Sequence, residues 1–161
     1  MLVIKNFGHF WNRNHVHWGA RGRGGTGALK GFITTDRRKQ IVDFRDQIGV
    51  YVLFTSASQR EAIYIGQSGT GENQRLLVRL RQHTTDDLRD RWQYFSWFGF
   101  RAVNQSLTLS EHQRPDSRCG GTHMDALNEI EAVLLQLFEP RLNKRGPNWG
   151  GDTVQYRQYV E

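Results

Sequence analysis

The run Gly49-Val-Tyr-Val-Leu-Phe54 is followed, after a short polar segment, by the run Ala62-Ile-Tyr-Ile-Gly66. Both runs are rich in β-branched and aromatic residues, which favour strands, and two such runs joined by a short polar link are typical of an antiparallel hairpin. If the turn is centred between residues 57 and 58, Tyr51 lies opposite Tyr64 and both side chains occupy one face of the sheet. The hairpin is therefore the element from which the rest of the fold is predicted.

After the hairpin, the sequence predicts a helix over 73–83, a third strand over 92–101 and a loop over 104–122. It then predicts a helix over 125–139, which ends at Pro140, and a last strand over 154–160. The predicted fold class is α+β, a small and mainly antiparallel three-stranded sheet flanked by the two helices. Residues 46–145 form the predicted domain. Residues 1–45 are a basic, aromatic and glycine-rich N-terminal extension, and residues 146–161 are a C-terminal turn and strand.

Charge is concentrated at the N-terminal end of the chain. The formal net charge is +6 over 161 residues, but residues 1–40 carry +7 and the rest of the chain sums to −1. Arginine outnumbers lysine 18 to 4, and the guanidinium group holds phosphate oxygens in pairs and stacks on bases. A nucleic acid is therefore the expected partner. The basic residues expected to contact it are Arg13, Arg21, Arg23, Lys30, Arg75 and Arg81.

Other classes of protein are disfavoured by composition. A single cysteine, Cys119, permits no internal disulfide and suits a reducing compartment. No stretch approaches the roughly 20 apolar residues that a membrane-spanning helix needs, and residues 1–20 lack the features of a secretory signal. We therefore expect a cytoplasmic protein with no membrane partner.

The helix predicted over 125–139 carries an acidic residue in an unusual position. Stepping at 100° per residue surrounds Glu131 with four large apolar neighbours and turns Glu129 to solvent. A carboxylate in apolar surroundings is costly unless a cation or strong donors meet it. One interpretation is a ligand for a hard metal ion. The alternative is an edge position from which Glu131 reaches solvent or pairs with an arginine.

The helix predicted over 73–83 carries a polar stripe beside its leucines. The stripe consists of Arg75, Arg79, Gln82 and His83. Spacings of three and four residues place these side chains on one face of a helix. Without further context, a solvated basic face is the better explanation of the stripe.

Taken in order along the chain, these elements resemble the GIY-YIG nuclease superfamily. Gly49-Val-Tyr51 stands where the first signature triplet belongs, and Tyr64-Ile-Gly66 is the second triplet. Arg79-Leu-Arg-Gln-His83 is similar to the family's Arg-Leu-x-x-His on the following helix, and this context favours Arg79 over Arg75 as the catalytic arginine that the resemblance implies. Glu131 matches the metal-binding glutamate of the family. Asn143 lies in Glu-Pro-Arg-Leu-Asn, which resembles the family's Pro-x-x-Asn.

The resemblance implies an endonuclease that hydrolyses phosphodiester bonds in DNA, with RNA as a further candidate substrate. It implies that Tyr51 or Tyr64 orients or deprotonates water, that Arg79 holds the phosphate, and that His83 orients a tyrosine or relays a proton. Glu131 would anchor one Mg²⁺ or Mn²⁺ ion per active site, and Asn143 would brace the site. Gln67 stands where many members have a lysine.

Three arrangements remain open at this level. The chain is a nuclease acting alone, with a homodimer as one way to cut both strands; it is the nuclease subunit of a larger defence, restriction or repair complex; or it is a binding module without activity. The N-terminal extension is expected to grip the phosphate backbone in each case.

Overall fold

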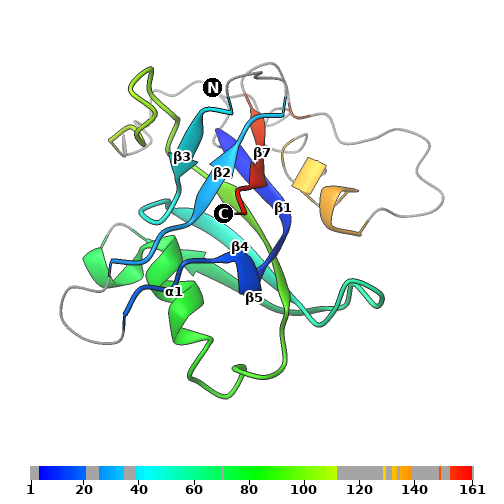
Figure 1. The fold of residues 1–161 in the computed structure, drawn as a ribbon. Helices are drawn as coiled ribbons and strands as arrows, with labels where there is room; N and C mark the ends of the chain where they lie inside the picture. The colour runs from blue at the N-terminus through cyan, green and yellow to red at the C-terminus, as the bar shows by residue number, and fades with distance from the viewer. Residues whose placement is uncertain are drawn as a thin grey trace.

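A computed structural model describes residues 4–20, 26–34, 39–69, 71–111, 129, 132–133, 135–138, 149 and 153–160. Its strands are β1 (Asn6–Asn12), β2 (Lys30–Phe32), β3 (Ile41–Asp43), β4 (Gly49–Phe54), β5 (Ala62–Ser68), β6 (Tyr94–Gly99) and β7 (Val154–Gln158). The helical elements with defined bounds are the 3₁₀ turns η1 (Arg13–His15) and η2 (Glu72–Gln74) and the α-helix α1 (Leu76–Gln82). The strands form one sheet in the order β3-β2-β7-β1-β6-β4-β5 (Figure 1).

The prediction of a small three-stranded sheet flanked by helices is wrong. Within the described residues the sheet has seven strands and is mixed, because β1 runs parallel to β7 while the other pairs are antiparallel. Residues expected to form an extension supply β1, β2 and β3. β1 pairs with β6, the strand that would have been the open edge of the smaller sheet. This pairing satisfies the backbone groups that an edge strand leaves exposed. β2 and β3 have only three residues each, too few to show the alternation by which a strand is predicted from sequence.

The hairpin itself is confirmed, with a different register. β4 pairs with both β5 and β6, as the predicted hairpin and third strand require. Tyr51 lies opposite Gly66, however, and Tyr64 lies opposite Leu53. The turn is closed by a hydrogen bond from the Thr55 amide to the Glu61 carbonyl, 3.0 Å, and the register shifts between Leu53 and Phe54. The observed register therefore differs by two residues from the predicted one, and a shift of two residues keeps both tyrosines on one face of the sheet.

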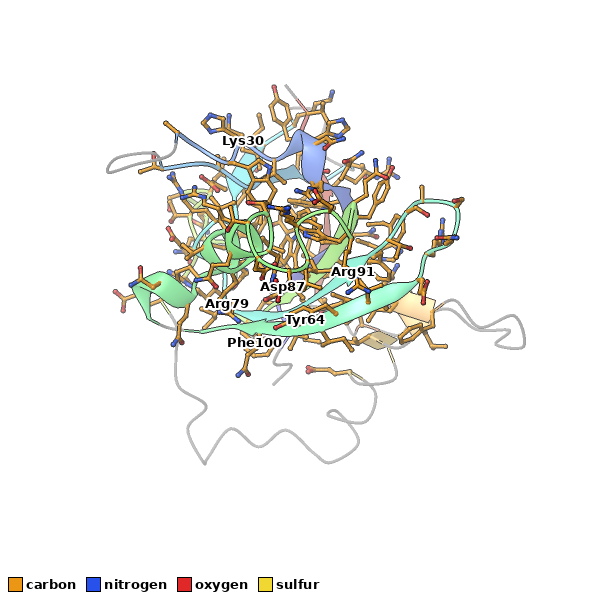
Figure 2. All side chains as sticks on the ribbon, turned by 90° about the horizontal axis from the view of Figure 1, so that it is seen from below. Lys30, Tyr64, Arg79, Asp87, Arg91 and Phe100 are labelled. Atoms are coloured by element: carbon orange, nitrogen blue, oxygen red, sulfur yellow. The ribbon has the colours of Figure 1, made fainter. Side chains whose placement is uncertain are left out.

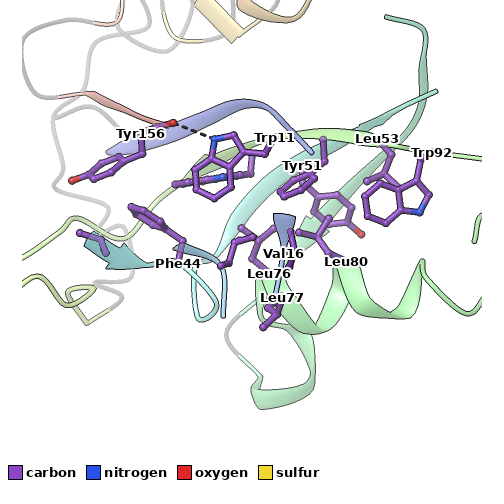
Figure 3. Packing of buried hydrophobic residues seen from close by; sticks show 14 residues of the cluster. Trp11, Val16, Phe44, Tyr51, Leu53, Leu76, Leu77, Leu80, Trp92 and Tyr156 are labelled. Carbon is purple, nitrogen blue, oxygen red and sulfur yellow. Dashed lines mark hydrogen bonds between the residues drawn. The ribbon is translucent and has the colours of Figure 1, made fainter. Parts of the chain in front are cut away.

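Each face of the sheet carries an apolar cluster. Along β4, Tyr51 and Leu53 belong to the cluster beneath α1, whereas Val52 and Phe54 belong to the cluster on the opposite face. The three buried leucines of α1, Leu76, Leu77 and Leu80, pack into the first cluster (Figure 3). β4 is therefore buried on both sides, which explains why its sequence is a continuous apolar run.

The first cluster continues across the sheet into a group of large aromatic residues. Trp11 of β1 packs edge-on against Trp97 of β6, with ring centroids 5.4 Å apart, and its indole N–H donates to the Tyr156 carbonyl at 3.2 Å (Figure 3). Phe44 packs against both Trp97 and Tyr156 at 4.6 Å. These contacts join strands from the two ends of the chain around one core.

The predicted helices are recovered in part. α1 begins at Leu76, because residues 72–74 form a 3₁₀ turn and Arg75 is extended. In the predicted helix 125–139, the described residues 129, 132–133 and 135–138 are helical. The predicted facing of this helix is wrong at two positions: Glu129 is buried at 7% exposure, and Phe138 is 53% exposed. A helical period shows which residues share a face of the helix, but it does not show which other part of the protein covers that face.

Candidate active site

The glycine of the second triplet makes room for the tyrosine of the first. Gly66 lies opposite Tyr51 in the β4–β5 pair. A side chain at Gly66 would overlap the ring and hydroxyl of Tyr51, and its Cβ would lie 2.8 Å from the ring of Tyr64. The two tyrosine rings lie 6.2 Å apart at an interplanar angle of 35°. Tyr51, Gly66 and Tyr64 are therefore one packed unit on the α1 face of the hairpin.

Tyr51 begins a chain of hydrogen bonds that leaves the sheet. Its hydroxyl lies 2.8 Å from Nε2 of His83, and both side chains are buried. The other ring nitrogen of His83, Nδ1, lies 2.7 Å from Oδ2 of Asp86. The His83 ring also packs against Tyr64, with centroids 4.7 Å apart. A phenol, an imidazole and a carboxylate are thus connected in sequence.

Helix α1 explains why His83 reaches the hairpin. Its leucines fix one face of the helix against the sheet, and Arg79 and His83, four residues apart, follow on the neighbouring face. His83 is the C-cap of the helix, and its carbonyl accepts a hydrogen bond from the Trp92 indole N–H at 2.9 Å. The histidine is therefore held at both its backbone and its ring.

The environment of Tyr51 favours its neutral form. The pKa of Tyr51 is raised to about 12, because burial opposes the charged phenolate and outweighs the positive charge of Arg79, which lowers it; the neighbouring Tyr64 raises it further. Tyr51 is also fully buried, at 0% exposure. A buried phenol with this pKa does not serve as a base near neutral pH.

Tyr64 and Arg79 lie at the accessible side of the same cluster. Both residues are partly exposed, and both act on the pKa of Tyr51. Nη1 of Arg79 donates to Oε1 of Gln82 at 2.8 Å. Figure 2 shows Tyr64 and Arg79 in the same part of the molecule, with Lys30 on the other side of it. The structure thus brings together Tyr51, Tyr64, Arg79 and His83, four of the residues that the sequence nominated.

Asp86 is the residue that the sequence analysis missed. The pKa of Asp86 is lowered: burial works to raise it, but the Leu88 amide, the contact with His83 and the charge of Arg79 together favour the carboxylate. Asp86 follows the C-cap histidine by three residues, in a segment without a helical or strand period. An acid at that spacing from a candidate histidine is the one feature that would have suggested it.

The other arginine of the helix motif points to a different neighbour. Arg75 donates to the carbonyl of Asp46 at 3.3 Å, and Arg101 donates to the same carbonyl at 2.9 Å. The pKa of Arg101 is lowered, first by burial and then by the charge of Arg75. Arg75 therefore belongs to a cationic pair beside Asp46, and only Arg79 of the two acts on Tyr51.

The remaining residues nominated for nucleic-acid contact are dispersed. Arg13 donates to the carbonyls of Arg89 and Trp92 and lies 4.4 Å above the Trp92 ring, so it ties η1 to the segment after α1. The guanidinium of Arg81 lies against the backbone at Gly27. Arg21 and Arg23 lie outside the described residues.

Lys30 lies near the C-terminal end of β7. It stands over the Tyr159 ring at 5.9 Å and lines a half-open cavity of about 240 Å³. His15 and His17, both exposed, line the same cavity. This surface is separate from the tyrosine cluster.

The predicted metal anchor Glu131 and the bracing residue Asn143 also lie outside the described residues. Among the residues that are described, no group of three or more His, Cys, Asp and Glu side chains is arranged to hold a metal ion. The Mg²⁺ or Mn²⁺ site therefore remains a prediction that depends on Glu131.

Comparison of the chain with protein-family models, with curated proteins and with solved structures gave no match. In the described part of the chain, no helix combines the length and apolar character needed to cross a membrane.

Proposed function

We propose that this chain is a metal-dependent endonuclease that hydrolyses phosphodiester bonds in DNA, with one active site built on the β4–β5 hairpin and α1. The observation that carries the proposal is the cluster of Tyr51, Tyr64, Arg79 and His83. These residues come from three separate elements, and the fold joins them on one face.

The geometry divides the two tyrosines between different roles. Tyr51 is buried, hydrogen-bonded to His83 and kept in its neutral form by its raised pKa, so we assign it a structural role in the site. Tyr64 is partly exposed beside it, so we assign it to contact with the attacking water. A phenol hydroxyl at this position orients the water by accepting one of its hydrogen bonds, and as it takes up that proton it releases its own to the solvent that reaches it.

Arg79 supplies the positive charge of the site. Its guanidinium is partly exposed beside the tyrosines and is well suited to pair with two phosphate oxygens of the scissile group. Charge that develops on those oxygens during attack is then stabilised by a donor that is already in place. The divalent ion, anchored by Glu131 in this proposal, would polarise the phosphate and the leaving oxygen.

The test is cleavage of supercoiled plasmid with Mg²⁺ or Mn²⁺, comparing the native chain with Tyr64→Phe and with Glu131→Ala. Loss of the Tyr64 hydroxyl should lower kcat roughly 10² to 10⁴-fold, as expected for a group that handles a proton. Glu131→Ala should abolish metal-dependent cutting. Both variants should retain DNA binding in a gel-shift assay, because phosphate contacts supply most of the affinity.

Matched controls separate chemistry from folding. Tyr94→Phe removes a hydroxyl from a partly exposed strand tyrosine that packs on the opposite face of the sheet, and it should change kcat less than about twofold. Glu61→Ala, at an exposed position, serves as the acidic control because Glu129 is buried. If every variant and the native chain bind DNA but none cuts plasmid, single strands or RNA, the proposal fails and a binding module or a partner-dependent subunit takes its place.

A further inference from the structure

The hydrogen-bond chain that starts at Tyr51 ends on a carboxylate to which the proposed mechanism gives no part. Asp86 is 41% exposed at its side chain, yet both of its oxygens are engaged. Oδ2 lies 2.7 Å from Nδ1 of His83, and Oδ1 accepts a hydrogen bond from the Leu88 amide at 2.9 Å. The second contact fixes the orientation of the carboxylate, so the first is made at a defined angle to the imidazole.

An ionised carboxylate only accepts hydrogen bonds, so it fixes the direction of its bond to His83 and, when the imidazole is neutral, the direction of the bond to Tyr51 as well. Facing Asp86, Nδ1 of His83 must carry a proton. In the neutral ring Nε2 is then an acceptor, and the Tyr51 hydroxyl donates to it across 2.8 Å. The lone pairs of the Tyr51 oxygen are thereby turned away from His83, toward Arg79 and Tyr64, the other groups that act on this hydroxyl.

We propose that Asp86 is a positioning residue that selects the Nδ1–H tautomer of His83, so that Nε2 accepts from Tyr51 and the buried phenol is held in a single orientation against Tyr64 and Arg79. The catalytic consequence rests on the proposed nuclease function. The tautomer itself is a property of the free protein.

The decisive variant is Asp86→Asn, which keeps the shape of the side chain. Its amide oxygen still accepts from the Leu88 amide, so the local turn is retained. Its NH₂ group now faces Nδ1 and donates to it, which moves the ring proton to Nε2 and reverses the bond to Tyr51. In an Asp-His pair of a hydrolytic triad the same exchange leaves the geometry intact and disables the histidine through the wrong tautomer.

The tautomer is read by ¹⁵N NMR of histidine-labelled protein, since protonated and unprotonated ring nitrogens have well separated shifts. The chain has 6 histidines, and His83→Gln identifies the signals of His83. We expect the native His83 to carry its proton on Nδ1 and Asp86→Asn to carry it on Nε2. In the plasmid assay, Asp86→Asn should lower kcat about 10 to 100-fold, the range found when the partner that orients a metal-ligating histidine is lost, with KM changed less than about twofold.

Two further variants frame the result. Asp87→Asn changes an exposed neighbouring acid and should alter neither the His83 spectrum nor kcat. Asp86→Glu keeps a carboxylate and should retain the Nδ1–H tautomer, which provides the comparison if the asparagine variant is poorly folded.

The outcomes separate the two proposals. If His83 keeps the Nδ1–H form in Asp86→Asn, or if the tautomer changes while kcat does not, the positioning role is overturned. If the tautomer changes as expected but the native chain cuts no substrate, Asp86 does select the tautomer and the nuclease proposal alone has failed.

Discussion

The two halves of the sheet are built in different ways. The hairpin half, which we define as β5, β4, β6 and α1, comes from one continuous stretch of chain, residues 49–99. The outer half, defined as β3, β2, β7 and β1, comes from residues 6–43 together with 154–158. The two halves meet where β1 pairs with β6, and in Figure 1 the blue, cyan and red strands of the outer half lie together.

The difference lies in what holds each half. In the hairpin half, a short turn joins β4 to β5, β6 follows α1 and pairs with β4, and the leucines of α1 pack back on these strands. In the outer half, β7 from the C-terminal end of the chain pairs with β1 and β2 from the N-terminal end. Aromatic residues connect them: Trp11 packs on Phe44 and donates to the Tyr156 carbonyl, and Phe44 packs on the Tyr156 ring. The candidate active site lies on the hairpin half, and the outer half adds large aromatic side chains to the core that the two halves share.

The largest expected effect comes from breaking the outer half at Trp11. This side chain is 2% exposed, packs on Trp97 and Phe44, and donates to the Tyr156 carbonyl. Trp11→Ala should lower the free energy of unfolding by about 3–5 kcal/mol, the range found when a buried aromatic side chain is truncated. Urea denaturation followed by circular dichroism measures it.

Ile65→Ala is the control in the hairpin half, because Ile65 is 63% exposed. Its effect should stay within about 0.5 kcal/mol. A comparable loss in the two variants would contradict the central role given to the aromatic bridge.

A smaller effect is expected from crowding the hairpin half at Gly66. A Cβ at this position would overlap the ring and hydroxyl of Tyr51. Gly66→Ala should cost about 1–3 kcal/mol, as inserted carbon atoms do in a packed core, and should weaken the contact between Tyr51 and His83. Urea denaturation gives the first quantity, and the ¹⁵N signals of His83 report the second.

Gly71→Ala is the matched glycine control. A Cβ there would lie 3.6 Å from the Gln74 side chain, an ordinary contact, and φ is −66°. Its stability should change little. An unperturbed His83 spectrum in Gly66→Ala would show that the packed unit of Tyr51, Gly66 and Tyr64 tolerates extra volume.

The remaining expected effect is confined to alkaline pH and tests the assignment of Tyr51. The pKa of Tyr51 is raised to about 12 in the folded chain, whereas an unfolded tyrosine titrates near 10. Between about pH 10 and 12 the folded state therefore binds more protons than the unfolded state, and stability falls as pH rises. The contribution of Tyr51 to the free energy of unfolding is fully present below about pH 10 and is lost as the pH rises through the pKa of the folded state, about 12.

The measurement is urea denaturation of the native chain and of Tyr51→Phe at a series of alkaline pH values. The native chain should lose stability more steeply than the variant, which lacks the ionisable group, and Tyr94→Phe should follow the native curve. Parallel curves for the native chain and Tyr51→Phe would remove the support for a buried, neutral Tyr51.

Part of the candidate site was predictable from the sequence because it depends on short-range patterns. Alternation in the two apolar runs gave the hairpin and placed Tyr51 and Tyr64 on one face. Helical spacing gave the stripe that contains Arg79 and His83. The facing of Glu129 was predicted wrongly, because a helical period shows which residues group together and does not show which surface covers them.

The hairpin, the position of α1 after it, and the residues that these elements present follow from the sequence, because strand alternation and helical spacing are local. Three other features become visible only once the chain is folded. These are the outer half of the sheet, the two-residue offset between the tyrosines, and the contact of Asp86 with His83. Each depends on groups brought together by packing or by an irregular turn, and neither leaves a period in the sequence.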